Sequence, residues 1–332
     1  QDAKYVQMAA RKCGSNGFMA EVCPFDNPEE FGKAPFDNLL ATMGLNYISG
    51  VRTTQSYAEA DFSAFGDGRF RDFLPRNQDM FGQVRKYFDR AQMRQLNAYV
   101  GRMGLLLDGL QNQCTTVLYF GIEDVQAKYT PKHDCEVGAQ AIGCDLATLR
   151  LLRAMLDEGR DFLFADAEDL TEIARTGRLG GEEIRRILLP GLDVIRPEAL
   201  AALRQLKKAG VCVLFAEKLP HIDALSGQQL QLAGEFEAVS VQEAVQIPDA
   251  QEPQFKTLSG PIVRQARYRT RDSKSMFFLL NPGRTESVVR LPGADARRCT
   301  ALDPFTGTIT QERLNRDWTV PAVRGIFIII EE

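Results

Sequence analysis

Gly17-Phe-Met-Ala-Glu-Val-Cys23 is the stretch from which the fold can be worked out. This apolar run predicts a buried strand, with Glu21 near its carboxyl end and a proline-containing loop after it. Phe36 to Met43 carries apolar residues at helical spacing, and Gly44 is a residue type that commonly follows a helix. Leu45 to Ser49 predicts the next short strand. A strand, a helix and a strand in this order indicate a parallel α/β fold.

A second α/β region follows a long helix. The helix is predicted from about Gln78 to Asp108, because its apolar positions step mainly by three and four. Strands that lack polar alternation, as is typical of sheets covered on both faces, then alternate with helices. The predicted strands are 116–120, 161–165, 183–190 and 211–215. This alternation indicates a flavodoxin-like, doubly wound domain.

The last part of the chain has an all-β pattern. Prolines and several Gln, Asp and Glu residues at 246–262 mark a linker. Short apolar strands follow, separated by turns such as Asn281-Pro-Gly283 and Pro304-Phe-Thr-Gly307. The pattern predicts a small antiparallel β-sandwich at 255–332.

Composition excludes several classes of function. The 332 residues carry a net charge of −4, with Lys and Arg scattered among Asp and Glu, so a nucleic-acid partner is not expected. No stretch reaches the roughly 18 apolar residues that span a bilayer, so no membrane span is expected. The seven cysteines form no CxxC pair, only two histidines accompany them, and no nucleotide-binding glycine pattern occurs. We therefore predict neither a metal site nor a cofactor.

The flavodoxin-like region lacks the residues for amidotransferase chemistry. A class I glutamine amidotransferase needs a cysteine on a strained turn after a strand, with a histidine and a glutamate downstream. After the predicted strand 211–215 the sequence reads Ala216-Glu217-Lys218, without a cysteine. We therefore interpret this region as a scaffold for packing or for forming a homo-oligomer.

Several short motifs occur in an order that resembles a known group of enzymes. Ala20-Glu21 ends the first strand and Gly44-Leu-Asn-Tyr-Ile48 follows the helix. The later motifs are Tyr99, Arg102, Leu106 and Gly109 on the long helix, Val117 to Pro131, Leu188-Leu-Pro-Gly191, and Asp303-Pro-Phe-Thr-Gly307. The arrangement resembles the α-L-rhamnosidases of glycoside hydrolase family 106. It is also similar to family 42 β-galactosidases, which carry a glutamine-amidotransferase-like trimerisation domain.

The resemblance implies three domains. Residues 1–112 would be the C-terminal part of a (βα)8 catalytic barrel with a long helix, 113–250 the flavodoxin-like or amidotransferase-like domain, and 255–332 the β-sandwich. The expected fold class is thus α/β, with a partial barrel first. A barrel needs eight strands, and we expect the earlier ones upstream of Gln1. A secreted protein, periplasmic or extracellular, is expected.

The resemblance also implies a function, the hydrolysis of O-glycosidic bonds in plant or host glycans. Glu21 would be one catalytic carboxylate and the other would lie upstream, because glycoside cleavage uses two. Asn46, Arg52 and Tyr57 would contact an oligosaccharide or glycoside substrate. Two plainer interpretations stay open: Glu21 pairs with an arginine, and the other three residues support a loop. A non-catalytic carbohydrate-binding or oligomerisation module is the alternative function.

Overall fold

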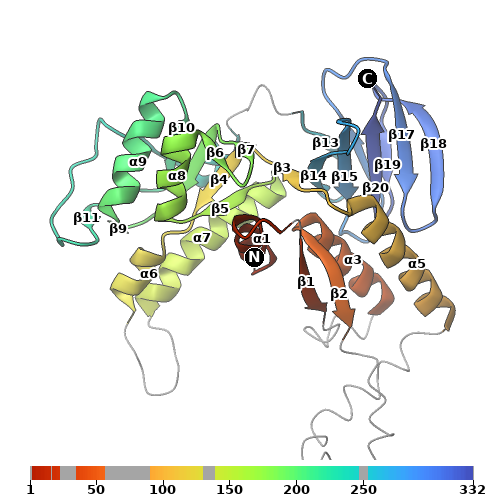
Figure 1. The fold of residues 1–332 in the computed structure, drawn as a ribbon, viewed down its shortest axis with the longest axis horizontal. Helices are drawn as coiled ribbons and strands as arrows, with labels where there is room; N and C mark the ends of the chain where they lie inside the picture. The colour runs from red at the N-terminus through yellow and green to blue at the C-terminus, as the bar shows by residue number, and fades with distance from the viewer. Residues whose placement is uncertain are drawn as a thin grey trace, which may run out of the picture. The chain divides into compact units, whose positions relative to one another are not determined.

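The computed structural model describes residues 2–15, 17–22, 35–56, 90–129, 139–246 and 253–331 (Figure 1). These residues belong to two compact units, each built from two separate stretches of the chain. The first unit draws on 1–12 and 113–254, and the second on 13–112 and 255–332. Parallel and antiparallel sheets are both present, as predicted for a mixed α/β chain. No helix within the described ranges is long and apolar enough to cross a bilayer.

The first unit is built on a five-stranded parallel sheet in the order β12-β10-β8-β4-β5. When these five strands are numbered 1 to 5 along the chain and read from the β5 edge, their order is 2-1-3-4-5. This is the order of flavodoxin-like sheets. They are β4 (Thr116–Tyr119), β5 (Leu163–Ala165), β8 (Arg186–Leu189), β10 (Cys212–Ala216) and β12 (Ala238–Val239). The helices are α1 (Asp2–Lys12), α6 (Ile122–Lys128), α7 (Ala139–Asp157), α8 (Ala167–Thr176), α9 (Pro197–Lys208) and α10 (Val241–Gln246). Two small ladders pair β6 (Arg178–Leu179) with β7 (Glu182–Glu183), and β9 (Val194–Ile195) with β11 (Ile222–Asp223).

Helices cover both faces of this parallel sheet. Along β4, Val117 and Tyr119 belong to the core that includes α8 and α9, whereas Leu118 belongs to the core that includes α7 and α10. Every residue of β4 and of β8 is buried. Two covered faces explain why these strands show no alternation of apolar and polar residues.

A strand–helix–strand segment lies in the second unit: β1 (Phe18–Val22), α3 (Pro35–Ile48) and β2 (Val51–Ser56), with the two strands parallel. The prediction of a strand at 45–49 is wrong, because α3 continues to Ile48. Gly44 lies inside the helix, where a Cβ atom would come within 2.5 Å of Leu280 Cδ1. This glycine therefore permits close packing, and Gly50, with a φ of 99°, makes the turn after the helix.

A six-stranded antiparallel sheet in the order β18-β17-β20-β15-β14-β3 is the centre of the second unit. One face shares a core with α3 and α5 (Arg90–Leu107), and the other with the three-stranded sheet β13-β16-β19. Along β15, Met276 and Phe278 face the helices, whereas Phe277 and Leu279 face the smaller sheet. The strands are β3 (Asn112–Gln113), β13 (Lys256–Ser259), β14 (Arg264–Arg269), β15 (Ser275–Leu280), β16 (Ser287–Arg290), β17 (Arg298–Asp303), β18 (Thr308–Arg313), β19 (Trp318–Val320) and β20 (Gly325–Ile330).

Two motifs that lie far apart in the sequence meet in this unit. Arg102 on α5 donates from Nη1 to the backbone oxygens of Pro304 at 3.0 Å and Phe305 at 2.9 Å. Asp303 Oδ1 accepts a hydrogen bond from the N–H of Phe305 at 2.8 Å and shapes the turn. A Cβ atom on Gly307, whose φ is 81°, would lie 3.1 Å from Arg102 Nε. These motif residues therefore fasten α5 to the β17–β18 turn.

Candidate functional site

The carboxyl ends of β1 and β2 form one edge, since the two strands are parallel. Glu21 lies opposite Gln55, and Val22 lies opposite Ser56. The backbone of Glu21 is thus at the end of β1, the end at which parallel barrels hold their catalytic residues. The side chain of Glu21 and all of Tyr57 lie outside the described residues.

Arg52 lies at the opposite end of β2 and binds backbone oxygens. Its guanidinium donates to the carbonyl groups of Tyr47 at 3.2 Å, Val51 at 2.9 Å and Leu110 at 3.0 Å. Three residues along a strand separate it from Gln55, a distance of about 10 Å. Arg52 therefore joins the end of α3, the start of β2 and the segment after α5, well away from the carboxyl edge.

Asn112 completes this anchor and was not identified from the sequence. It is fully buried, and its Nδ2 donates to the backbone oxygen of Ile48 at 3.0 Å. Arg52 Nη2 lies 3.5 Å from Asn112 Oδ1, and the guanidinium carbon lies 5.7 Å from the ring centre of Tyr268. Since the partners are mostly backbone groups from distant segments, no sequence pattern could reveal them.

Asn46 is not at a strand end. It is half-buried on the last turns of α3, ahead of β2. The strand predicted at 45–49, which would put Asn46 and Arg52 at or after its end, does not exist, because α3 continues to Ile48 and β2 begins at Val51. The structure therefore brings neither of them to the edge that carries Glu21.

The first unit has a strained turn at the carboxyl end of β10. Glu217 has a φ of 71°, and the N–H of Lys218 bonds back to the oxygen of Ala216 at 2.9 Å, which makes a γ-turn. A Cβ atom on Gly191 would lie 3.2 Å from that same oxygen and 3.3 Å from Glu217 Oε2. Glu217 forms an ion pair with Arg150 at 2.8 Å. A glutamate thus occupies the strained turn that follows β10.

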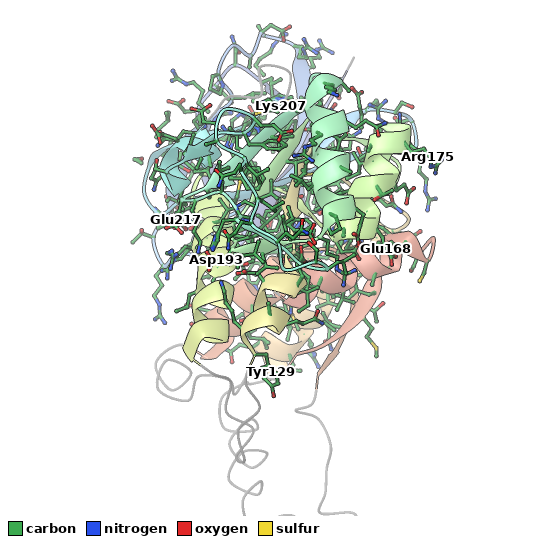
Figure 2. All side chains as sticks on the ribbon, turned by 90° about the vertical axis from the view of Figure 1, so that its left-hand side faces the viewer. Tyr129, Glu168, Arg175, Asp193, Lys207 and Glu217 are labelled. Atoms are coloured by element: carbon green, nitrogen blue, oxygen red, sulfur yellow. The ribbon has the colours of Figure 1, made fainter. Side chains whose placement is uncertain are left out.

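Asp193 is the centre of an ionic cluster beside this turn (Figure 2). Its carboxylate pairs with Lys128 and Lys218, and His221 Nδ1 lies 3.7 Å away. Burial raises the pKa of Asp193, but the hydrogen bonds from the two lysines outweigh that effect and hold the pKa below its ordinary value. The carboxylate of Asp193 therefore remains ionised at neutral pH, and its ion pairs stabilise the loops at the edge of the sheet.

Two buried carboxyl groups on α6 support the same loops. Asp124 Oδ1 accepts the N–H groups of Asp193 and Val194, each at 2.9 Å. Tyr119 donates its hydroxyl to Glu123 Oε1 at 2.6 Å. Burial raises the pKa of Glu123 above its ordinary value, although the Tyr119 hydrogen bond acts in the other direction. Within the part of the chain that the structure describes, no group of three or more His, Cys, Asp and Glu side chains could hold a metal ion.

Several solved structures with a similar fold are glycoside hydrolases. A rhamnosidase from Novosphingobium sp. PP1Y is 16% identical with a TM-score of 0.58, and the match covers 100% of this chain and 33% of that chain. A β-galactosidase from Bacillus circulans sp. alkalophilus is 11% identical with a TM-score of 0.57, and the match covers 99% and 58%. An exo-carrageenase of family 42 from Bacteroides ovatus is 13% identical with a TM-score of 0.53, and the match covers 90% and 39%.

These similarities concern the fold. No family model matches the sequence, and no curated protein matches it. The chain spans 33%, 58% and 39% of the lengths of the three enzymes named above. The protein therefore has a fold like that of part of these glycoside hydrolases.

Proposed function

We propose that this chain is part of a glycoside hydrolase and supplies one of its two catalytic carboxylates, Glu21. In this proposal residues 1–112 close a (βα)8 barrel, 113–250 form an amidotransferase-like scaffold, and 255–332 form a β-sandwich. The substrate would be a glycoside or oligosaccharide. The similarity in fold to three enzymes that hydrolyse glycosides supports the class of reaction.

The position of Glu21 at the carboxyl end of β1 carries the proposal. In parallel barrels the catalytic groups lie at this end of the strands. β1 and β2 are parallel and α3 connects them, which is the repeating element of such a barrel. Among the described residues this parallel ladder has only two strands, and a parallel sheet this small is not stable alone. Met19 on β1 is 59% exposed, as expected for an apolar residue that further barrel elements would cover.

The second carboxylate would come from residues that precede this chain. Glycoside cleavage needs one group to protonate the leaving oxygen and one to attack the sugar or activate water. Tyr57, which follows β2 in the sequence, is proposed as a contact of the substrate. Arg52 lies behind the edge that carries Glu21, and the support of β2 is the role that we propose for it.

The experiment compares the 332-residue chain with the polypeptide extended upstream to its encoded start. The extended protein should hydrolyse one or more aryl glycosides, and the 332-residue chain alone should not. Glu21→Gln in the extended protein should lower kcat by at least about 10³-fold. Glu286→Gln, an exposed glutamate of the same unit, is the control.

The role of Glu21 can be separated from a structural effect by chemical rescue. With Glu21→Ala and added azide, a glycosyl azide should form, because azide enters the space of the missing carboxylate. A full-rate Glu21→Gln variant would contradict the catalytic role. Hydrolysis by the 332-residue chain alone, abolished by Glu21→Gln, would contradict the location of the second carboxylate.

For the first unit we propose a scaffold that forms a homo-oligomer. The support is Glu217, which stands where an amidotransferase would need cysteine. Light scattering during gel filtration tests this: the protein should have a multiple of its monomer mass. A monomer at all concentrations, or release of ammonia from glutamine, would contradict the scaffold role.

A further inference from the structure

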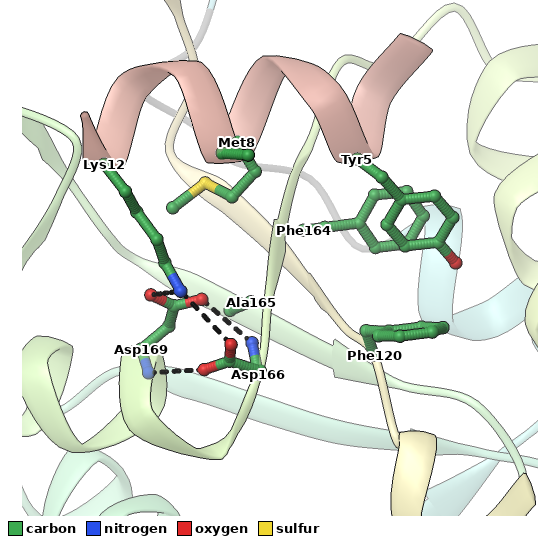
Figure 3. Close-up of a pocket in the computed structure, with 9 residues that line it drawn as sticks. Tyr5, Met8, Lys12, Phe120, Phe164, Ala165, Asp166 and Asp169 are labelled. Carbon is green, nitrogen blue, oxygen red and sulfur yellow. Dashed lines mark hydrogen bonds and ion pairs between the residues drawn. The ribbon is translucent and has the colours of Figure 1, made fainter. Parts of the chain in front are cut away.

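A pocket lies at the carboxyl ends of β4 and β5 in the first unit, where α1 crosses them (Figure 3). It is open to solvent on one side and holds about 170 Å³. Its lining residues are Tyr5, Met8, Ala9, Lys12, Phe120, Phe164, Ala165, Asp166 and Asp169. In open α/β sheets the carboxyl edge is where ligands bind. None of these residues belongs to the edge that carries Glu21.

One side of the pocket is aromatic. The ring of Tyr5 stacks on that of Phe164 with centres 4.0 Å apart, and it meets Phe120 edge-on at 4.7 Å. Met8, which is 5% exposed, adds a thioether. Figure 3 shows Phe120 and Phe164 below α1, and Met8 between them and the Lys12 side, with its thioether directed toward Lys12. This side of the pocket offers apolar surface held in a fixed geometry.

The other side is charged. Lys12 Nζ lies 3.1 Å from Asp166 Oδ2 and 2.8 Å from Asp169 Oδ1. The two carboxylates also cap α8, because Asp166 Oδ1 accepts the N–H of Asp169 and Asp169 Oδ2 accepts the N–H of Asp166. Burial lowers the pKa of Lys12, but its hydrogen bonds to Asp169 and Asp166 outweigh this and raise the pKa above its ordinary value. The ammonium group is therefore charged at neutral pH.

These charged groups keep unused hydrogen-bonding capacity. A carboxylate oxygen has two lone pairs, and an ammonium has three donors. The side chains of Lys12 and Asp166 are 39% and 42% exposed, so both reach the open side of the pocket. A ligand there meets donors and acceptors within a few ångströms. A hydroxyl group suits both, since it donates to a carboxylate and accepts from an ammonium.

We propose that this pocket binds one sugar ring of a glycan, separately from the edge that carries Glu21. A pyranose presents apolar C–H groups on its face, for the aromatic side, and hydroxyl groups at its rim, for Lys12 and Asp166. The size agrees, because a cavity of about 150 Å³ already takes up a six-membered ring. The site would hold a glycan to the protein without cleaving it, and it does not depend on the proposed hydrolase activity.

The test is a titration with free monosaccharides, observed at Met8. D-galactose, L-rhamnose, L-fucose and D-glucose are added to protein labelled with ¹³C at the methionine methyl groups. At least one sugar should shift the Met8 methyl resonance with a dissociation constant in the millimolar range. The resonance of Met103, which is buried on α5 in the other unit, should not move.

Three variants make the test specific. Lys12→Met removes the donor but keeps the length of the side chain, and it should weaken binding at least tenfold. Ala9→Phe fills the pocket from an exposed position on α1, and it should abolish binding while the thermal unfolding midpoint is retained. Lys208→Met, an exposed lysine on α9, is the matched control and should bind like the unaltered protein.

Two results would overturn the proposal. One is a Met8 resonance that none of the sugars shifts even at the highest concentration, whether or not tetramethylammonium, the probe for a cation site, shifts it. The other is unchanged binding in both Lys12→Met and Ala9→Phe. Glu21→Gln should leave sugar binding at Met8 unchanged, so failure of the hydrolase proposal and failure of this one are distinguishable.

Discussion

The side chain of Arg52 occupies the space into which a side chain on Gly17 would project. A Cβ atom at residue 17 would fall 2.1 Å from Arg52 Cγ and 2.8 Å from Arg52 Cβ. These atoms are close to the backbone, and the hydrogen bonds of the guanidinium hold the side chain in place. Moving them away would therefore cost free energy. The start of β1 therefore requires a glycine so that Arg52 can support β2.

Gly17→Ala should destabilise the protein by about 1–3 kcal/mol, as expected for overpacking of a closely packed site. Chemical denaturation measures the effect. Gly101→Ala on α5 is the control, because a Cβ atom there meets nothing within 4 Å and should stabilise the helix by up to about 1 kcal/mol. Equal stability of Gly17→Ala and the unaltered protein would show that the contact between residues 17 and 52 is not tight.

Asp124→Ala should cost about 3 kcal/mol, because it leaves the N–H groups of Asp193 and Val194 without their acceptor. Asp124→Asn keeps an acceptor oxygen and should cost less than half as much. Urea unfolding of the two variants gives both values. Similar losses in the two variants would mean that the charge, and not the acceptor oxygen, matters at this position.

The stability of the Glu123→Gln variant, relative to that of the parent, should increase as the pH rises. The raised pKa of Glu123 means that the folded protein prefers the protonated form. The protonated carboxyl therefore contributes to stability below the pKa that Glu123 has in the unfolded chain. This contribution is lost as the pH rises through the pKa that Glu123 has in the folded protein. The uncharged glutamine avoids this loss and still accepts from Tyr119. The free energy of unfolding of the variant, relative to that of the parent, should increase between pH 4 and pH 7.

The matched control for this pH dependence is Glu172→Gln, an exposed residue on α8. The change of its stability difference with pH is subtracted from that of Glu123→Gln. A corrected difference that is flat would show that the hydrogen bond from Tyr119 offsets the burial of the charge.

Glu217→Gly should be more stable than Glu217→Ala by about 1 kcal/mol, because glycine adopts a positive φ without steric cost. Both variants lose the ion pair with Arg150. The difference between their stabilities therefore reports only the cost of the positive φ at this position. At Glu198 in α9 the same pair of substitutions should give the opposite order, since alanine favours a helix. If Ala were as stable as Gly at 217, the γ-turn would have to relax in the variant.

Sequence patterns predict those structural features that depend on residues close together in the chain. The buried runs 116–119 and 186–189 identify the parallel strands because two covered faces leave no polar alternation. The prediction that Gly44 ends the helix is wrong, because this glycine is needed for its contact with Leu280, more than two hundred residues away. The apolar face of α5 shows that the helix is buried, but not that its partner is a sheet formed by residues 264–330. Likewise, the sequence around Arg52 cannot show that its guanidinium donates to carbonyl groups at residues 47, 51 and 110.

The position of β20 has a consequence for synthesis of the protein. This last strand pairs with both β15 and β17 in the middle of the six-stranded sheet that α3 and α5 cover. A ribosome adds about 5–20 residues per second, so roughly 10–45 s separate the emergence of α5 from that of β20. The stretch 113–254 emerges complete in that interval. The first unit can therefore fold on the nascent chain, whereas the second must wait, with its helices exposed to chaperones, until β20 has been synthesised.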